Sequence, residues 1–305
     1  MPPYRRSRAR VTVVLGCAAL VGVVVLGGVA VTQAGQSPER PSAVQGQPVS
    51  TIAQVAQTRI AIAGDTGTGT AVEEATAERM ARQAGPDGYD GLLLLGDLVY
   101  DEGDPALVDT VVTGPFRAVL AGGAELVPVL GNHDHGSGRA DEVLQRLGRS
   151  RGWYTEQVGS VRLVVLDTEQ VQDPAQTQWL SQVLAESQPS GTWTIVAMHR
   201  PAYSAGQHGS SLDVRHAWSD LFARYDVPLV LAGHDHDYQR SVPQDGVVYV
   251  VSGAGAKLRP TGSQDFTAVS TSTLHYVDLA AYPDRLDLTA VDQTGDLVDE
   301  FTITR

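Results

Sequence analysis

Leu92-Leu93-Leu94-Leu95-Gly96-Asp97-Leu98-Val99-Tyr100 is an apolar run that ends in a short polar cluster. Four consecutive leucines are typical of a strand that is buried on both faces of a parallel sheet. The Gly-Asp pair ends that strand, so Asp97 and Tyr100 are expected at its carboxyl edge, where open α/β sheets bind their ligands. This stretch therefore predicts a layered α/β fold whose functional site lies at the strand ends.

Four further polar clusters follow apolar runs or short strand-like segments in the same way. They are Gly64-Asp65-Thr66-Gly67, Gly131-Asn132-His133-Asp134-His135, Met198-His199-Arg200-Pro201 and Gly233-His234-Asp235-His236-Asp237-Tyr238. Each cluster alone is typical of a turn. Together they bring carboxylate, amide, phenol and imidazole groups to five successive strand ends, which is the set of ligands that hard divalent and trivalent cations take. The sequence therefore predicts a metal site at the carboxyl ends of the strands.

Strand-like and helix-like segments alternate along the rest of the chain. We expect strands at 59–63, 92–95, 125–130, 161–166, 193–198 and 227–231, and helices at 71–83, 106–121, 175–186 and 212–225. Beyond residue 247 only strands are expected, at 247–251, 273–279, 285–291 and 297–303. This order predicts one α/β catalytic domain over residues 58–305, with a late antiparallel set of strands.

The composition limits the possible chemistry. The chain has 305 residues, with 22 Lys or Arg against 35 Asp or Glu, for a net charge of −13, and Lys257 is its only lysine. Nucleic-acid binding is not expected, because it takes a basic face. Cys17 is the only cysteine, so the chain beyond it has no thiol for a disulfide, a thiolate metal site or a nucleophile. Catalysis would have to use His, Asp, Asn, Tyr, Ser or a metal.

The N-terminus has the pattern of an export segment. Arg5, Arg6, Arg8 and Arg10 precede the uncharged run 11–31, which is long enough to span a bilayer at about 20 residues per crossing. Residues 1–34 are therefore expected to be an uncleaved signal-anchor or a signal peptide cleaved after Ala34. In both cases the rest of the chain would be extracytoplasmic, either membrane-anchored or secreted. Residues 35–57, rich in Gln, Pro, Ser and Gly, are expected to form a flexible linker.

The five clusters resemble, in order, those of the calcineurin-like metallophosphoesterases. That family has Asp-x-Gly or Asp-x-His, Gly-Asp, Gly-Asn-His-Asp or Glu, a later His, and Gly-His-x-His. Here Gly67 stands where most members have the first His, and Tyr100 is available instead. With this paired change the chain resembles the purple acid phosphatases. The resemblance covers residues 58–305 and implies a four-layer α/β/β/α sandwich of mixed sheets with the metal site at strand C-terminal ends.

The resemblance also implies two metal ions and a reaction. The first metal would be held by Asp65, Asp97, Tyr100 and His236, and the second by Asp97, Asn132, His199 and His234. Asp97 would bridge them, since a carboxylate has two oxygens. A tyrosinate ligand favours Fe³⁺ at the first site, with divalent Fe, Zn or Mn at the second. The implied activity is hydrolysis of small phosphomonoesters by attack of a metal-bound hydroxide.

Two further histidines are candidate catalytic residues. His133, beside the expected ligand Asn132, would contact phosphate or donate a proton. His208 lies on the loop after His199 and would be catalytic or phosphate-binding, or else an ordinary surface histidine. Asp134 would orient His133 or cap a turn, and Arg200 would contact phosphate or pair with an acid. We expect His135 beside the ligands or exposed to solvent, and His216 and His275 as structural residues.

Two other functions fit the same motifs. Pocket loops set specificity, so the substrate could instead be a phosphodiester or a nucleotide. A surface binding module that has kept the fold without catalysis is disfavoured, because none of the seven expected ligands is missing. The expected partner is therefore a small phosphate ester, with the membrane as a second partner if residues 1–34 are retained.

Overall fold

The computed structural model of the protein describes residues 56–305. The expected export segment 1–34 and nearly all of the linker 35–57 lie outside the described residues. Between residues 56 and 305, no helix has the length and apolar character needed to cross a membrane.

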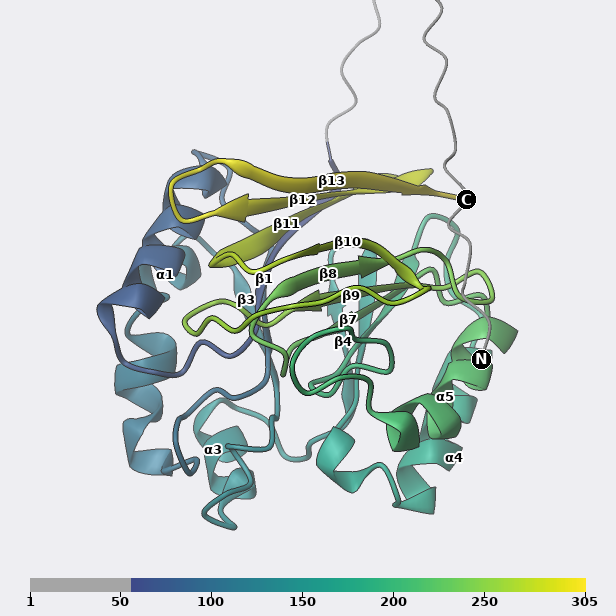
Figure 1. Cartoon of the computed structure of the whole chain (residues 1–305), viewed down its shortest axis with the longest axis horizontal. Coiled ribbons are helices and arrows are strands. Elements are labelled where there is room, and N and C mark those ends of the chain that lie inside the picture. Colours follow the sequence, from purple (N-terminus) through teal and green to yellow (C-terminus); the bar gives the residue numbers. More distant parts are fainter. Residues whose placement is uncertain (1–55) are drawn as a thin grey trace, which may run out of the picture. The chain divides into compact units, whose positions relative to one another are not determined.

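Two mixed sheets form the centre of this domain (Figure 1). The first has the strand order β13-β12-β11-β1-β2-β3, and the second has the order β10-β8-β9-β7-β6-β5-β4. Strands of the first sheet are β1 (Thr58–Ala63), β2 (Gly91–Leu95), β3 (Glu125–Val129), β11 (His275–Ala281), β12 (Arg285–Asp292) and β13 (Leu297–Thr304). Strands of the second are β4 (Tyr154–Val158), β5 (Val161–Val165), β6 (Trp193–Ala197), β7 (Leu229–Ala232), β8 (Tyr238–Ser241), β9 (Val248–Ser252) and β10 (Thr267–Thr271).

The leucine run forms the central strand β2, and all four leucines are buried. Because side chains alternate along a strand, Leu93 and Leu95 join the hydrophobic core between the two sheets. Leu92 and Leu94 join a second core beneath α1 (Ala71–Ala84). A third core lies between the second sheet and the helices α4 (Pro174–Ala185) and α5 (Leu212–Arg224). In Figure 1, α1 and the pair α4 and α5 lie on opposite sides of the sheets. The four-layer α/β/β/α prediction is confirmed.

The expected single helix over 106–121 is wrong. The structure has a short 3₁₀ helix at Pro105–Leu107, a π-helical turn at Asp109–Thr113 and the α-helix α2 (Arg117–Ala121). Pro115 explains the interruption, since it lacks the N–H that a continuous helix would need at that position. A further helix, α3 (Ala140–Arg146), and the strands β4, β8 and β10 were not expected from the sequence.

Candidate metal centre

The predicted ligands lie where parallel strands of both sheets end. β1, β2 and β3 run parallel in one sheet, and β6 and β7 run parallel in the other. Their carboxyl ends are followed by Asp65, Asp97, Asn132, His199 and the pair His234 and His236. Asp65, Asp97 and His234 have positive φ angles of 58°, 51° and 72°. Such left-handed conformations are costly without glycine and gather at functional sites, where a sharp turn aims the side chain.

One group of donor atoms surrounds the Tyr100 hydroxyl. This hydroxyl lies 3.1 Å from Asp65 Oδ1, 2.9 Å from Asp97 Oδ2 and 3.3 Å from His236 Nε2. His236 Nε2 is also 3.3 Å from Asp65 Oδ1. The four residues predicted for the first metal therefore converge on one point.

A second group surrounds His199. Its Nε2 lies 3.2 Å from Asn132 Oδ1, 3.4 Å from Asp97 Oδ1 and 3.3 Å from His234 Nδ1. Donor atoms of Asp65, Asp97 and His199 all lie within 4.8 Å of one another, and all three residues are buried. Asp97 thus presents one oxygen to each group, which is the arrangement that a bridging carboxylate requires.

The electrostatics of these residues fit cation binding. Burial, together with the charge of Asp97, raises the pKa of Asp65 well above its ordinary range. Burial also lowers the pKa of His234, and it lowers that of His236 to about 4, with help from the charges of Arg259 and Lys257. Both imidazoles are therefore neutral near pH 7, as metal ligands must be. A cation bound beside Asp65 and Asp97 would displace the proton of Asp65 and neutralise the charge of the two buried carboxylates.

The carbonyl of Leu95 orients one of the predicted ligands. It lies 2.8 Å from His199 Nδ1 and can only accept a hydrogen bond, so Nδ1 carries the proton. Nε2 of His199 is then left with its lone pair facing Asn132 and Asp97, as a metal ligand requires.

The backbone explains why Tyr100 accompanies Gly67. A Cβ atom on Gly67 would lie 1.8 Å from the carbonyl oxygen of Leu98, so no side chain fits at the position that corresponds to the histidine of the Asp-x-His pattern. The Tyr100 N–H donates to the Gly67 carbonyl at 2.9 Å, which fixes the start of the loop that carries the phenol. The close approach of the two loops therefore excludes the histidine, and the same contact positions the tyrosine.

His133 and His208 both lie beside the predicted ligands. His133 Nδ1 is 2.5 Å from the Asp101 carbonyl, its Nε2 is 4.0 Å from Asp97 Oδ2, and 37% of its side chain is exposed. The ring of His208 stacks at 4.5 Å, centroid to centroid, from that of His234. Burial lowers the pKa of His208. One histidine therefore lies beside each group of donors.

The loop that carries His208 is tied to the strand end that carries His234 and His236. Asp235, between these histidines, is buried and accepts the backbone N–H of His208 at 2.7 Å and the hydroxyl of Ser204. Gln239 accepts the N–H of Ala205 at 2.7 Å and donates to the Ser204 hydroxyl at 2.8 Å. The sequence does not indicate this network, because its members are polar residues without a metal-ligand pattern.

The remaining candidates have structural contacts. Asp134 is fully buried, and its carboxylate accepts N–H groups from Gly131, Leu98 and Val99 at 2.7–3.1 Å, so it caps the loops and does not orient His133. Arg200 pairs with Glu169, and its Nη1 lies 3.4 Å from His234 Nε2. Structural contacts are also made by His135, 3.2 Å from Asp167, and by buried His275, 3.0 Å from the Ser252 hydroxyl.

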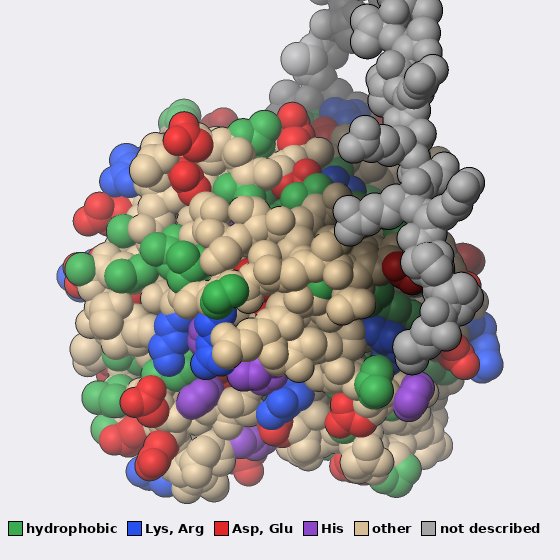
Figure 2. Space-filling model, in the orientation of Figure 1, with side chains coloured by type: hydrophobic (Ala, Val, Ile, Leu, Met, Phe, Trp, Pro, Cys, Tyr) green, Lys and Arg blue, Asp and Glu red, His purple; other side chains and the backbone are tan. Residues whose placement is uncertain are grey.

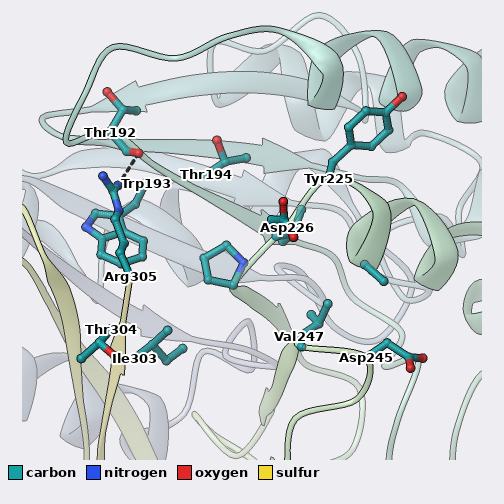
Figure 3. Close-up of a pocket in the computed structure, with 14 residues that line it drawn as sticks. Thr192, Trp193, Thr194, Tyr225, Asp226, Asp245, Val247, Ile303, Thr304 and Arg305 are labelled. Atoms are coloured by element: carbon teal, nitrogen blue, oxygen red, sulfur yellow. Dashed lines mark hydrogen bonds between the residues drawn. The ribbon is translucent and has the colours of Figure 1, made fainter.

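A pocket of about 440 Å³ lies elsewhere in the domain (Figure 3). Its walls include Thr192, Trp193, Pro228 and Val247, which precede or begin β6, β7 and β9, together with the C-terminal Arg305. These are the amino ends of the parallel strands, whereas the predicted metal ligands follow carboxyl ends of parallel strands. The pocket is therefore separate from the candidate metal centre.

The comparisons agree with this geometry. The sequence model of the calcineurin-like phosphoesterase family matches residues 58–238, and the chain belongs to this family. Within it, the similarity extends to acid phosphatases. Tartrate-resistant acid phosphatase type 5 of Homo sapiens is 30% identical over 228 residues, which cover 63% of this chain and 69% of that protein.

Two further relatives are similar over different lengths. An uncharacterized protein of Mycobacterium tuberculosis is 34% identical over 113 residues, which are 32% of this chain and 21% of that protein. The chain thus spans about a fifth of that relative. The structure of a purple acid phosphatase from yellow lupin (Lupinus luteus) seeds superposes with a TM-score of 0.73 at 22% identity, covering 83% of this chain and 54% of the lupin chain. This last likeness is one of fold.

Proposed function

We propose that this protein is a dinuclear-metal phosphatase that hydrolyses phosphomonoesters. The observation that carries the proposal is the convergence of seven donor residues into two groups that share Asp97. One cation would be held by Asp65, Asp97, Tyr100 and His236, and the other by Asp97, Asn132, His199 and His234. Two cations bound there would polarise the phosphoryl group and lower the pKa of water at the site. Similarity to tartrate-resistant acid phosphatase supports the choice of substrate class.

His133 is the proton donor in this proposal. Its Nδ1 donates to the Asp101 carbonyl, so Nε2 is the nitrogen left to exchange a proton with the leaving group. His208, stacked on His234, binds the phosphate. Replacing either histidine by Ala is expected to lower turnover by about 100-fold while metal content stays the same. Loss of metal in either variant would contradict the assigned role.

Kinetics on two nitrophenyl esters test the function. The purified chain is assayed with 4-nitrophenyl phosphate and bis(4-nitrophenyl) phosphate, after chelation and after metal is restored. The proposal predicts that activity disappears and returns with the metal, and that the monoester is the better substrate. Preference for the diester would favour the phosphodiesterase alternative, and activity that survives complete removal of metal would refute the metal mechanism.

We further propose Fe³⁺ at the Tyr100 site and divalent Fe, Zn or Mn at the other. Burial and the charges of Asp65 and Asp97 raise the pKa of Tyr100, so a highly charged cation is needed to displace its proton. The expected spectroscopic signature is a broad visible absorption band of the metal-loaded protein, and this band should be absent in Tyr100→Phe. Two bound metals without iron or colour would refute this assignment.

We also propose that residues 1–34 export the chain, as a membrane anchor or as a cleaved signal peptide. The support is the arginine cluster before the apolar run 11–31. Fractionation of cells that produce the full chain, with N-terminal sequencing of the product, distinguishes the two forms. A cytoplasmic, uncleaved product that is free of membrane would refute export.

A further inference from the structure

The only lysine of the chain lies at the candidate metal centre. Lys257 belongs to the loop between β9 and β10, about twenty residues beyond the last ligand motif. Its Nζ lies 3.2 Å from the ring centroid of Tyr100, and a third of its side chain is exposed. Tyr100 is therefore covered by a cation whose side chain also reaches solvent.

The Lys257 ammonium has no close carboxylate partner, and the charges of Asp97 and Asp65 attract it from a longer distance. Its nearest carboxylate oxygen is that of Asp101, at 3.9 Å, on a side chain that is 85% exposed. Two other cations near the metal ligands have closer polar contacts. Arg259 Nε donates to His236 Nδ1 at 3.2 Å, and Arg200 forms an ion pair with Glu169. Arg200 and Arg259 thus donate hydrogen bonds to neighbouring side chains, whereas the Lys257 ammonium donates none to another described residue, so its N–H groups are available to an incoming anion.

This placement contrasts with the acidic composition of the chain. The net charge is −13, and Figure 2 shows Lys, Arg and His side chains beside one another on part of the visible face, with Asp and Glu scattered around them. An acidic surface repels anions, whereas an ammonium beside the ligands attracts them at short range. The attraction grows with the charge of the ligand, so it is greater for a dianion than for a monoanion.

We infer that Lys257 is a specificity-determining residue that contacts the phosphoryl group and favours phosphomonoester dianions over singly charged phosphodiesters. The inference rests on the proposed function, because it names the substrate class of the same site. A lysine that only packed on the Tyr100 ring would affect stability or metal binding. Its replacement would then lower kcat/KM for both esters by the same factor.

Two variants of Lys257 test the specificity. Lys257→Met keeps the apolar stem and removes the charge, whereas Lys257→Arg keeps the charge. Arg82→Met, on the exposed face of α1, is the matched control. We expect Lys257→Met to lower kcat/KM for 4-nitrophenyl phosphate about tenfold and that for bis(4-nitrophenyl) phosphate less than twofold. Lys257→Arg should keep most of the preference. Equal losses for both esters, or no loss, would overturn the inference.

Chemical labelling gives a readout that does not depend on turnover. An acylating reagent can modify only two amines in this chain, Lys257 and the α-amino group, and the latter is the internal control. Peptide mass spectrometry follows both rates in the metal-loaded protein. Inorganic phosphate is expected to slow acylation of Lys257 at least fivefold and to leave the α-amino group unchanged. Unchanged acylation of Lys257 would overturn the inference.

The two experiments separate failure of this inference from failure of the proposed function. If metal-loaded protein hydrolyses neither ester but phosphate still protects Lys257, the phosphatase proposal fails and the anion contact stands. If the monoester is hydrolysed but phosphate does not protect Lys257, and Lys257→Met keeps the monoester preference, the inference fails alone.

Discussion

Asp235 links the predicted metal ligands to the loop of His208, and Asp235→Asn tests whether that link matters for activity. The Ser204 hydroxyl accepts N–H groups from Gly206 at 2.9 Å and from Gln239 at 2.8 Å, so its own proton is donated to Asp235. The other carboxylate oxygen accepts the His208 N–H at 2.7 Å. An asparagine offers one acceptor oxygen where the buried site needs two. One of the two hydrogen bonds is therefore lost.

The size of the effect follows from this loss. A hydrogen bond to a charged group contributes about 1.5–3 kcal/mol, and part of that is recovered when the loop relaxes. If the active conformation of the loop is destabilised by about 1.4 kcal/mol, kcat/KM falls about tenfold. If Asp235 acts only through the loop of His208, the decrease should not exceed that of His208→Ala.

A double-mutant cycle provides the assay. We measure kcat/KM for 4-nitrophenyl phosphate and metal content in Asp235→Asn, in His208→Ala and in the double variant. The double variant should be no slower than His208→Ala, with a coupling of at least about 1 kcal/mol and unchanged metal content. Additive losses, or loss of metal in Asp235→Asn, would refute the positioning role.

Three other substitutions test the loops around the site. Asp134→Ala should lower the free energy of unfolding by about 3 kcal/mol or more, measured by urea denaturation, because three buried N–H groups lose their acceptor. Tyr100→Phe should lower the metal content measured by elemental analysis, and adding Gly67→His should not restore it, because the Cβ of the new histidine would overlap the carbonyl of Leu98. Burial raises the pKa of Glu73 to about 8, so the folded state keeps a proton that the unfolded state releases near pH 4.3. Stability should then fall by up to about 5 kcal/mol as pH rises from about 4.3 to 8, and urea titrations of Glu73→Gln should lack this slope.

Each of these predictions has a contradicting result. A loss below about 1 kcal/mol in Asp134→Ala would mean that the freed N–H groups find other partners. Recovery of metal by the Gly67→His variant would show that the loops can separate. Equal pH slopes of stability in Glu73→Gln and in the wild-type chain would show that a group other than Glu73 causes the pH dependence. Replacement of the exposed Glu300 by Gln provides the control for that comparison.

The sequence predicted those features that depend on local pattern. The leucine run at residues 92–95 marked a strand buried on both faces, and each ligand cluster stood directly after such a strand. Parallel strands of one sheet end at a common edge, so the closeness of Asp65 and Asp97 followed from their positions along the chain. His199 follows β6 of the second sheet, and it joins them because the two sheets pack with these strand ends together. The strands that were missed lack this pattern. β4, for example, is a sheet-edge strand with the sequence Tyr-Thr-Glu-Gln-Val and only one fully buried residue.

Features that depend on contacts between distant loops were not predictable in this way. Lys257 follows the ligand motifs and has no ligand pattern of its own, and only the fold brings it over Tyr100. Asp134 adjoins His133 in sequence, yet its carboxylate turns away to cap the loop of Leu98 and Val99. In both cases the partner is supplied by a loop whose path depends on tertiary packing.

The most direct test of the dinuclear phosphatase is the metal content of the purified full chain and of Asp97→Asn, measured together with monoester hydrolysis. Asp97 is the residue whose two oxygens face both groups of donors. We predict about two metal ions per wild-type chain, and loss of at least one ion together with activity in the variant. A wild-type chain with fewer than two ions at full activity, or an Asp97→Asn variant that keeps both its metal and its activity, would contradict the dinuclear metal mechanism.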